Sequence, residues 1–143
     1  MRAGGFSLIE MLVVLVILGL VLALVTRNGQ SRSARVELRG TAAQLTETLR
    51  LAQARAITGN RVSVVALDAA QHGVRIDGDA PRPLPPRLAA VIRAPGGLRG
   101  GGEIRFGPDG GSSGGQIELA DGPLRMRIDV DWLTGRIAVA RVP

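Results

Sequence analysis

The 143-residue sequence contains no cysteine, no lysine and no tyrosine, and its aromatic side chains are limited to Phe6, Phe106 and Trp132. Without cysteine the chain has no disulfide, no thiolate ligand for a metal and no cysteine nucleophile. Its one histidine, His72, has no second imidazole with which to build a zinc site. With so few aromatic residues, the core has to be built from valine, isoleucine, leucine and alanine. We therefore expect no bound metal and no other cofactor.

All of the basic charge is arginine. The 18 arginines stand against 12 acidic residues, which gives a net charge of +6. A strongly basic chain can bind nucleic acid or an anionic membrane surface. The arginines are scattered along the sequence, however, and no aromatic residues lie among them to stack on bases. Nucleic acid is therefore expected as a partner only in the alternative interpretation given below.

The N-terminal region contains a long apolar stretch. In residues 6–25 only Ser7 and Glu10 are polar, and the sequence from Met11 onward is unbroken. Twenty helical residues rise about 30 Å, which matches the hydrocarbon thickness of a bilayer. A helix that is apolar on every face cannot be enclosed by so short a chain, and no small-x-small cleavage site of an ordinary signal peptide follows it. We predict a transmembrane helix over residues 6–26.

The residues around this stretch form a recognisable pattern. A short basic leader, Met1-Arg2-Ala3-Gly4-Gly5, precedes Phe6-Ser7-Leu8-Ile9-Glu10 and the apolar run. The pattern resembles the start of the type IV pilins and the type II secretion pseudopilins. The resemblance implies that a membrane-bound prepilin peptidase removes residues 1–5 by cutting after Gly5 and methylates the new amine on Phe6. It also implies assembly with other pseudopilins or pilins.

Glu10 is the one acid within the apolar run. A carboxylate costs about 2 to 3 kcal/mol toward the centre of a membrane helix and is usually functional there, although at the interface headgroups would keep it solvated. Cleavage after Gly5 would leave a positive amine on Phe6, one helical turn away, and the two charges can neutralise each other within or between subunits. By resemblance, pairing between subunits sets the axial register of a filament. Glu10 is therefore the predicted registration residue.

The arginines beside the apolar run give a conflicting signal about orientation. Arg27, Arg32, Arg35 and Arg39 follow it, whereas only Arg2 precedes it. The positive-inside rule by itself would place the C-terminal part in the cytoplasm. The resemblance implies the opposite, a single-pass protein of the bacterial inner membrane with its C-terminal domain in the periplasm. We adopt the second expectation.

The helix is expected to continue beyond the apolar run. No proline interrupts residues 6–58, and Gly59-Asn60 supplies a helix stop. Over residues 27–58 we predict an amphipathic helix, with Thr46 away from its apolar face. The apolar residues alternate spacings of four and three and form one narrow stripe: Leu38, Ala42, Leu45, Leu49, Ala52 and Ala56. The stripe is expected to lie against a sheet, with a coiled-coil dimer as the alternative.

Residues 59–143 are predicted to form a periplasmic β domain. Alternation is clearest where Leu124, Met126, Ile128 and Val130 face one way. The predicted strands are 61–67, 73–76, 88–93, 103–106, 116–119, 124–131 and 136–142, and the first is expected at a central position against the helix. Four prolines between residues 78 and 87 predict a loop. The expected fold class is α+β and pilin-like, a long N-terminal α-helix, transmembrane in its first half, packed on an antiparallel β-sheet or small β-sandwich.

Two further stretches resemble the GspH/FimT branch of the pilin-like family. They are Phe106-Gly107-Pro108-Asp109-Gly110-Gly111-Ser112-Ser113-Gly114-Gly115, and Asp129-x-Asp131 followed by Thr134-Gly135-Arg136. The resemblance implies a minor pseudopilin of a type II secretion system, assembled into the pseudopilus or its tip to drive protein export. The alternative is a FimT-like minor type IV pilin in pilus assembly or DNA uptake. Residues 68–102 show no such resemblance, which fits a variable surface region.

The sequence offers no convincing catalytic group, and we expect no enzyme. The glycine-rich stretch lacks the Lys-Ser/Thr of a phosphate loop, and Pro108-Asp109-Gly110 is typical of a turn. Asp77-Gly78-Asp79 is only a fragment of a calcium loop and is expected to be a solvated turn. Ser112 and Ser113 have no nearby base in the sequence, and one histidine does not support a triad.

A charged pattern near the C-terminus is a candidate partner surface. Arg125, Arg127, Asp129 and Asp131 share one face of the strand predicted over 124–131. The simpler interpretation is a polar outer face, and the alternative is a docking surface for another subunit. Trp132, beside the following turn, is expected to plug the core and not to anchor a partner.

Overall fold

The computed structural model describes residues 7–94 and 102–142, and residues 25–32 and 141–142 by their backbone alone. The chain divides into two compact units, residues 1–35 and residues 36–143. One helix, α1 (Leu8–Gly59), is followed by eight strands in the described part of the chain. They are β1 (Ser63–Asp68), β2 (Gly73–Ile76), β3 (Arg82–Pro83), β4 (Ala89–Arg93), β5 (Glu103–Phe106), β6 (Gly115–Asp121), β7 (Leu124–Val130) and β8 (Ile137–Val142).

Helix α1 begins and ends where local chemistry allows it. Ser7 caps the first turn, because its hydroxyl oxygen accepts a hydrogen bond from the Glu10 N–H at 3.2 Å. At the other end Asn60 takes a positive φ of 47°, and the Arg61 N–H bonds to the Ala56 carbonyl at 3.2 Å. The helix stop predicted at Gly59-Asn60 is therefore confirmed to within one residue.

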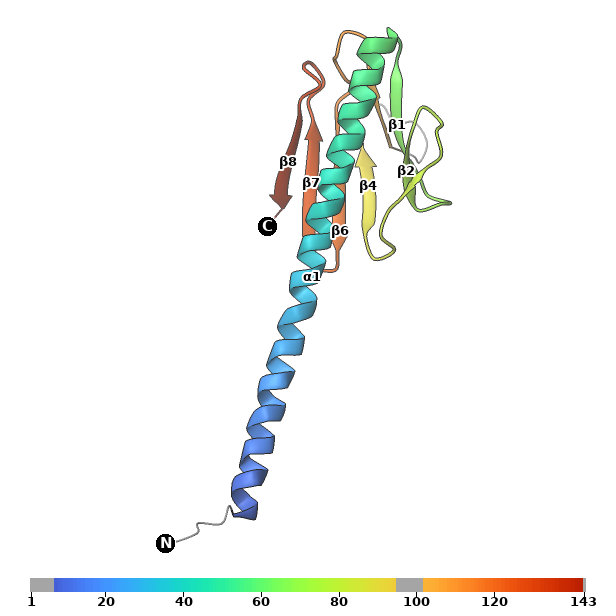
Figure 1. The fold of residues 1–143 in the computed structure, drawn as a ribbon. Helices are drawn as coiled ribbons and strands as arrows, with labels where there is room; N and C mark the ends of the chain where they lie inside the picture. The colour runs from blue at the N-terminus through green and yellow to red at the C-terminus, as the bar shows by residue number, and fades with distance from the viewer. Residues whose placement is uncertain (1–6, 95–101, 143) are drawn as a thin grey trace. The chain divides into compact units, whose positions relative to one another are not determined.

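The predicted apolar stripe of α1 is buried in the second unit. Its six residues, Leu38, Ala42, Leu45, Leu49, Ala52 and Ala56, all belong to the main hydrophobic core. The core also takes residues from both sheets, so the chain's own strands cover the stripe and leave the coiled-coil alternative without a free apolar face. Figure 1 shows this half of α1 lying across β4, β6 and β7.

Thr46 corrects one detail of the predicted helix face. It was expected away from the stripe, yet its side chain is 8% exposed. Burial is tolerated because its hydroxyl donates to the Ala42 carbonyl at 2.8 Å, which satisfies the polar group within the helix. Thr41 and Thr48 are buried in the same way, each bonded to the carbonyl four residues earlier.

The strands form two four-stranded antiparallel sheets, with orders β3-β2-β1-β5 and β4-β6-β7-β8. β1 lies between β2 and β5, as its predicted central position requires. Along β7 the residues Met126, Ile128 and Val130 are buried, which confirms the alternation read from the sequence. The predicted α+β class is confirmed, in the form of one long helix and two antiparallel sheets.

The proline-rich segment differs from its prediction as a plain loop. It contains β3, a two-residue strand that pairs Pro83 with Gly73 and Arg82 with Val74. Proline is tolerated there because β3 is an edge strand. The approach also needs glycine at position 73, since a Cβ there would lie 2.7 Å from the Arg82 carbonyl oxygen. Such a cross-strand contact has no local signature in the sequence.

Candidate functional site

The predicted processing site, Gly5 and Phe6, lies outside the described residues. The description begins at Ser7, whose carbonyl accepts hydrogen bonds from the N–H groups of Glu10 at 3.0 Å and Met11 at 3.3 Å. Glu10 itself is exposed and lies in the first turn of α1. A carboxylate in that position is favoured by the partial positive charge of a helix N-terminus.

Ser7 is a helix-capping residue beside the predicted site that the sequence reasoning missed. The spacing Ser7-x-x-Glu10 before an apolar run is the signature of a capping box, and its serine half is formed in the structure. The cap fixes where α1 starts and thereby places Glu10 in its first turn.

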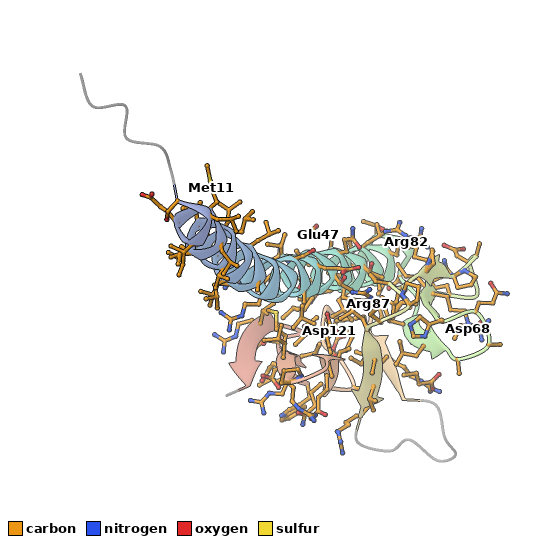
Figure 2. All side chains as sticks on the ribbon, turned by 90° about the horizontal axis from the view of Figure 1, so that it is seen from below. Met11, Glu47, Asp68, Arg82, Arg87 and Asp121 are labelled. Carbon is orange, nitrogen blue, oxygen red and sulfur yellow. The ribbon has the colours of Figure 1, made fainter. Side chains whose placement is uncertain are left out.

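The large apolar side chains described in the first unit are exposed. From Leu8 to Leu24 every large apolar side chain is between 49% and 86% exposed. Figure 2 shows carbon side chains standing out around the helix near Met11. In the part of the chain that the structure describes, no helix has the length and hydropathy needed to cross a membrane.

The structure keeps three of the four predicted partner-surface residues together. Arg125, Arg127 and Asp129 alternate with the buried residues of β7 and so lie on the face of the sheet opposite the core. Arg127 Nε lies 3.1 Å from Asp129 Oδ2. On neighbouring strands Arg93 pairs with Glu118 at 3.4 Å. Such exposed pairs contribute about 0 to 1 kcal/mol each and organise the face more than they stabilise it.

Asp131, the fourth residue, lies beyond the end of β7 and holds the following turn. One of its carboxylate oxygens accepts hydrogen bonds from the Thr134 hydroxyl at 2.7 Å, the Thr134 N–H at 2.8 Å and the Leu133 N–H at 3.2 Å. The bonds from Thr134 are the main reason that the pKa of Asp131 is lowered from its ordinary value of 3.8, with smaller contributions from Leu133 and Arg136. The carboxylate is therefore ionised and already engaged.

The prediction that Trp132 packs into the core is wrong. It is 66% exposed, as is its neighbour Leu133. The turn holds it outside the core, because Asp131 bonds to the residues after it and the Trp132 carbonyl accepts the Ser112 N–H at 3.0 Å. Gly114 packs against its base, where an added Cβ would come within 2.9 Å of the Trp132 Cβ.

A groove of 560 Å³ runs beside this tryptophan. It is bounded by the β6 entry, the end of β7 and the start of β8, and it is lined by Ser112, Ser113, Gly114, Gly115, Asp129, Val130, Asp131, Trp132, Arg136 and Ala138. The glycine-rich stretch that forms one wall is a set of turns, with Gly110 at a φ of 84° and its N–H bonded to the Gly107 carbonyl at 3.0 Å. The turn predicted at Pro108-Asp109-Gly110 is confirmed.

Asp77 is more than the solvated turn that was predicted. Its side chain is 11% exposed, and it accepts hydrogen bonds from the Val64 N–H and the Ser63 hydroxyl, both at 2.8 Å. Asp79, by contrast, is exposed and pairs with Arg55 at 2.6 Å. The motif is therefore a clamp between β1 and the turn after β2. His72 is exposed in the turn between β1 and β2, and its Nε2 lies 3.2 Å from the Pro85 carbonyl oxygen.

The sequence matches two protein families along most of its length. Residues 41–135 match the family described as type II transport protein GspH, and residues 1–26 match the prokaryotic N-terminal methylation motif. The type II secretion system protein H of Xanthomonas campestris pv. campestris is 32% identical over 139 residues, covering 93% of this chain and 80% of that protein. The chain belongs to the GspH family. The resemblance to type II secretion minor pseudopilins is thereby confirmed, and the methylation motif indicates a membrane-anchored protein.

Solved structures agree with this GspH fold. The minor pseudopilin EpsH of the Vibrio cholerae type 2 secretion system superposes with a TM-score of 0.57 at 11% identity, covering 73% of this chain and 97% of that chain. The type IV minor pilin FimU of Pseudomonas aeruginosa gives 0.54 at 17% identity, covering 76% and 90%. At such identities the likeness concerns the fold and not the function.

Proposed function

We propose that this GspH-family chain is a minor pseudopilin that is anchored in the bacterial inner membrane, processed after Gly5 and incorporated into the pseudopilus of a type II secretion system. The observation that carries the proposal is the 32% identity to a type II secretion protein H over 139 residues. The role is mechanical, because the subunit transmits extension to the exported protein through its contacts with neighbouring subunits. We assign it no catalytic step.

The exposed first unit supports the anchoring part of the proposal. Side chains such as Leu12, Leu15 and Leu22 are more than half exposed, and leaving such surface in water is unfavourable by about 25 cal/mol per Å². Lipid in the precursor and neighbouring helices in the filament would both cover it. We place residues 6–26 in the inner membrane as a single span, and residues 59–143 in the periplasm.

The N-terminal chemistry forms the second part of the proposal. Cleavage by prepilin peptidase leaves a methylated amine on Phe6, and Glu10 supplies the opposite charge in a setting with little water. In the filament the Glu10 carboxylate of one subunit pairs with the Phe6 amine of a neighbour and sets the axial register. The cap from Ser7 holds Glu10 in the first helical turn for that contact.

The alternative, a minor type IV pilin that takes part in DNA uptake, has less support. The family match and the 32% identical relative both carry type II transport names. In addition, seven arginines pair with acids in the described residues: Arg50, Arg55, Arg61, Arg75, Arg93, Arg105 and Arg127. Local pairing weakens the positive field that a phosphate backbone would meet.

The proposal is tested on the full chain in its own membrane. Mass spectrometry of the mature protein is expected to find a chain that begins at methylated Phe6. The substitution Glu10→Ala is expected to leave cleavage intact and to abolish secretion and pseudopilus incorporation, since the buried amine loses its partner. Glu47→Ala is the matched control, because Glu47 is an exposed acid of the same helix, labelled in Figure 2, and its one ion pair among the described residues is with Arg50. A mature chain that begins at Met1, or normal secretion by Glu10→Ala, would contradict the proposal.

A further inference from the structure

Among the described residues, each of the two sheets ends in two edge strands, and three of these four edges are protected. β3 is two residues long and contains proline. The outer edge of β5 is occupied by Ser113, which donates its N–H to the Arg105 carbonyl at 2.8 Å and accepts the Arg105 N–H at 3.1 Å. At the edge of β4, Gly102 lies so close to the Ile92 carbonyl that a Cβ there would overlap it. Short length, proline and covering segments are the usual means of blocking edge-to-edge pairing.

The outer edge of β8 has no such protection in the described residues. β8 is the last strand of its sheet and runs for six residues, Ile137–Val142. The Asp131 N–H bonds to the Arg136 carbonyl at 2.9 Å, and alternate residues of an antiparallel strand direct their N–H and C=O groups to the same neighbour. Residues 138, 140 and 142 therefore bond to β7, whereas residues 137, 139 and 141 direct their backbone groups to the open edge. Figure 1 shows β8 at the margin of the sheet.

Exposed apolar side chains lie on both faces of the sheet near this edge. Val139 is 46% exposed and pairs with Ile128, so it lies on the core face, whereas Trp132 stands at the groove that is lined by Arg136 and Ala138 on the opposite face. The backbone at Trp132 is held by the Asp131 turn and by the Ser112 N–H, which bonds to the Trp132 carbonyl at 3.0 Å, so the turn already presents the tryptophan at the surface. Tryptophan is one of the residue types that most often carry binding energy at protein interfaces.

The charges near the edge indicate what kind of segment fits. Arg125 lies at the far end of the adjoining strand and Arg136 at the near end of β8. Neither forms a salt bridge with the described residues, although the charge of Arg136 also acts on the Asp131 carboxylate beside it. Each copy of the chain carries a net charge of +6, which disfavours pairing of two copies edge to edge. A segment with carboxylates toward its ends and apolar residues between them complements this edge.

We propose that β8 receives an extended, acidic and apolar segment of a different pseudopilin subunit, which adds to the sheet as a further strand and packs an apolar side chain into the groove against Trp132. Main-chain hydrogen bonds to residues 137, 139 and 141 give such strand addition its affinity, and the groove gives it specificity. The inference rests on the proposed function, because it assumes assembly with other pseudopilins.

Along β8 the backbone groups point alternately to β7 and to the open edge. A substitution at an edge-facing position can therefore block an added strand and leave the bonds to β7 in place. Val139→Pro removes an N–H that points to the open edge, where proline is tolerated, and so blocks an added strand without removing a bond to β7. Val139→Ala is the matched control, because it shortens the side chain and keeps the N–H. The full-length chain in detergent micelles is titrated with each of the other purified pseudopilins of its secretion system.

We expect one acidic subunit to bind, Val139→Pro to weaken that binding about tenfold, and Val139→Ala to bind nearly as the unaltered chain does. Trp132→Ala is expected to weaken it at least about tenfold as well. Binding by Val139→Pro and Trp132→Ala at the unaltered affinity would overturn the inference, as would the failure of every subunit to bind.

Hydrogen exchange on the unaltered chain gives a readout that does not depend on any variant. On complex formation, the amides of residues 137, 139 and 141 are expected to gain protection, while those of 138 and 140 are protected already. Protection that instead rises with the concentration of the chain alone would identify a second copy as the occupant and overturn the inference. If these tests overturn strand addition while methylated Phe6 and the secretion defect of Glu10→Ala are observed, the proposed function is supported and only the strand-addition inference is wrong.

Discussion

Single carboxylates position the backbone at two places in the β domain. Asp77 joins β1 to the turn after β2, and Asp131 shapes the turn between β7 and β8. Both accept hydrogen bonds from backbone N–H groups that would otherwise depend on water. The consequence differs, because Asp77 is nearly buried and secures the sheet, whereas Asp131 is exposed and presents Trp132.

The pKa of Asp131 leads to a pH-dependent prediction. Its pKa in the folded chain is below the ordinary value of 3.8, so its stabilising contribution is present above 3.8 and is lost as the pH falls through the lower folded value. Asp131→Asn is expected to lower the urea midpoint of unfolding at pH 7. At about pH 2 the difference in urea midpoint between Asp131→Asn and the unaltered chain is expected to be smaller.

The control for this pH experiment is Asp121→Asn. Asp121 ends β6 and is labelled in Figure 2, and its carboxylate accepts no hydrogen bond among the described residues. We expect its substitution to change the urea midpoint little at either pH. An Asp131→Asn effect of equal size at both pH values would show that the Asp131 bonds do not depend on its charge.

At the scale of elements, the second half of α1 is the main partner of both sheets. Its stripe consists of three leucines and three alanines, and the alanines bring the helix backbone close to the strands while the leucines fill the space between. Buried threonines complete this face by bonding back to their own helix. The buried face of α1 is therefore wider than its apolar stripe, because it also includes these threonines.

Two neighbouring leucines of α1 test this packing. Leu49 is fully buried, whereas Leu51, two residues later, is 37% exposed. Leu49→Ala is expected to lower the free energy of unfolding by about 2 to 5 kcal/mol, because it leaves a cavity that the sheets cannot fill. Leu51→Ala is expected to lower it by about 0.5 kcal/mol. Urea denaturation followed by circular dichroism measures both, and similar losses for the two variants would contradict the packing described.

At the scale of the whole chain, the two units meet different surroundings. The hydrophobic core runs from Leu38 to Val130 and lies within the second unit, while the large apolar side chains described in the first unit are exposed. The second unit therefore has a hydrophobic core of its own, which an independently folding unit needs. The first unit needs lipid or other helices to cover its apolar side chains.

This division predicts that residues 36–143 fold without the rest of the chain. We expect a soluble protein with one cooperative thermal transition, measured by circular dichroism, and with the size of a folded monomer in gel filtration. Residues 59–143 are the matched control and are expected not to fold, because without the α1 stripe the sheets lose the inner partner of their core. A folded 59–143 piece, or an unfolded 36–143 piece, would contradict the division.

Periodicity in the sequence predicted the helices and strands that bury one face along their whole length. The bounds of β2 and β5 match the prediction, and the ends of α1, β7 and β8 differ from it by one or two residues. Alternation reports burial of one sheet face, and this is why Met126, Ile128 and Val130 were assigned correctly. The predicted site residues divide differently, since Arg125, Arg127 and Asp129 share a face but Asp131 belongs to the turn.

The sequence by itself determined the family, the apolar N-terminal run, the helix stripe and the strand alternation, because each depends on residues near one another along the chain. Only the tertiary structure decided the pairing of β3 with β2, the burial of Thr46, the clamp made by Asp77, the exposure of Trp132 and the open edge of β8. These depend on which distant backbone groups come together, and a side chain's neighbours across a sheet leave no periodic trace in its own segment.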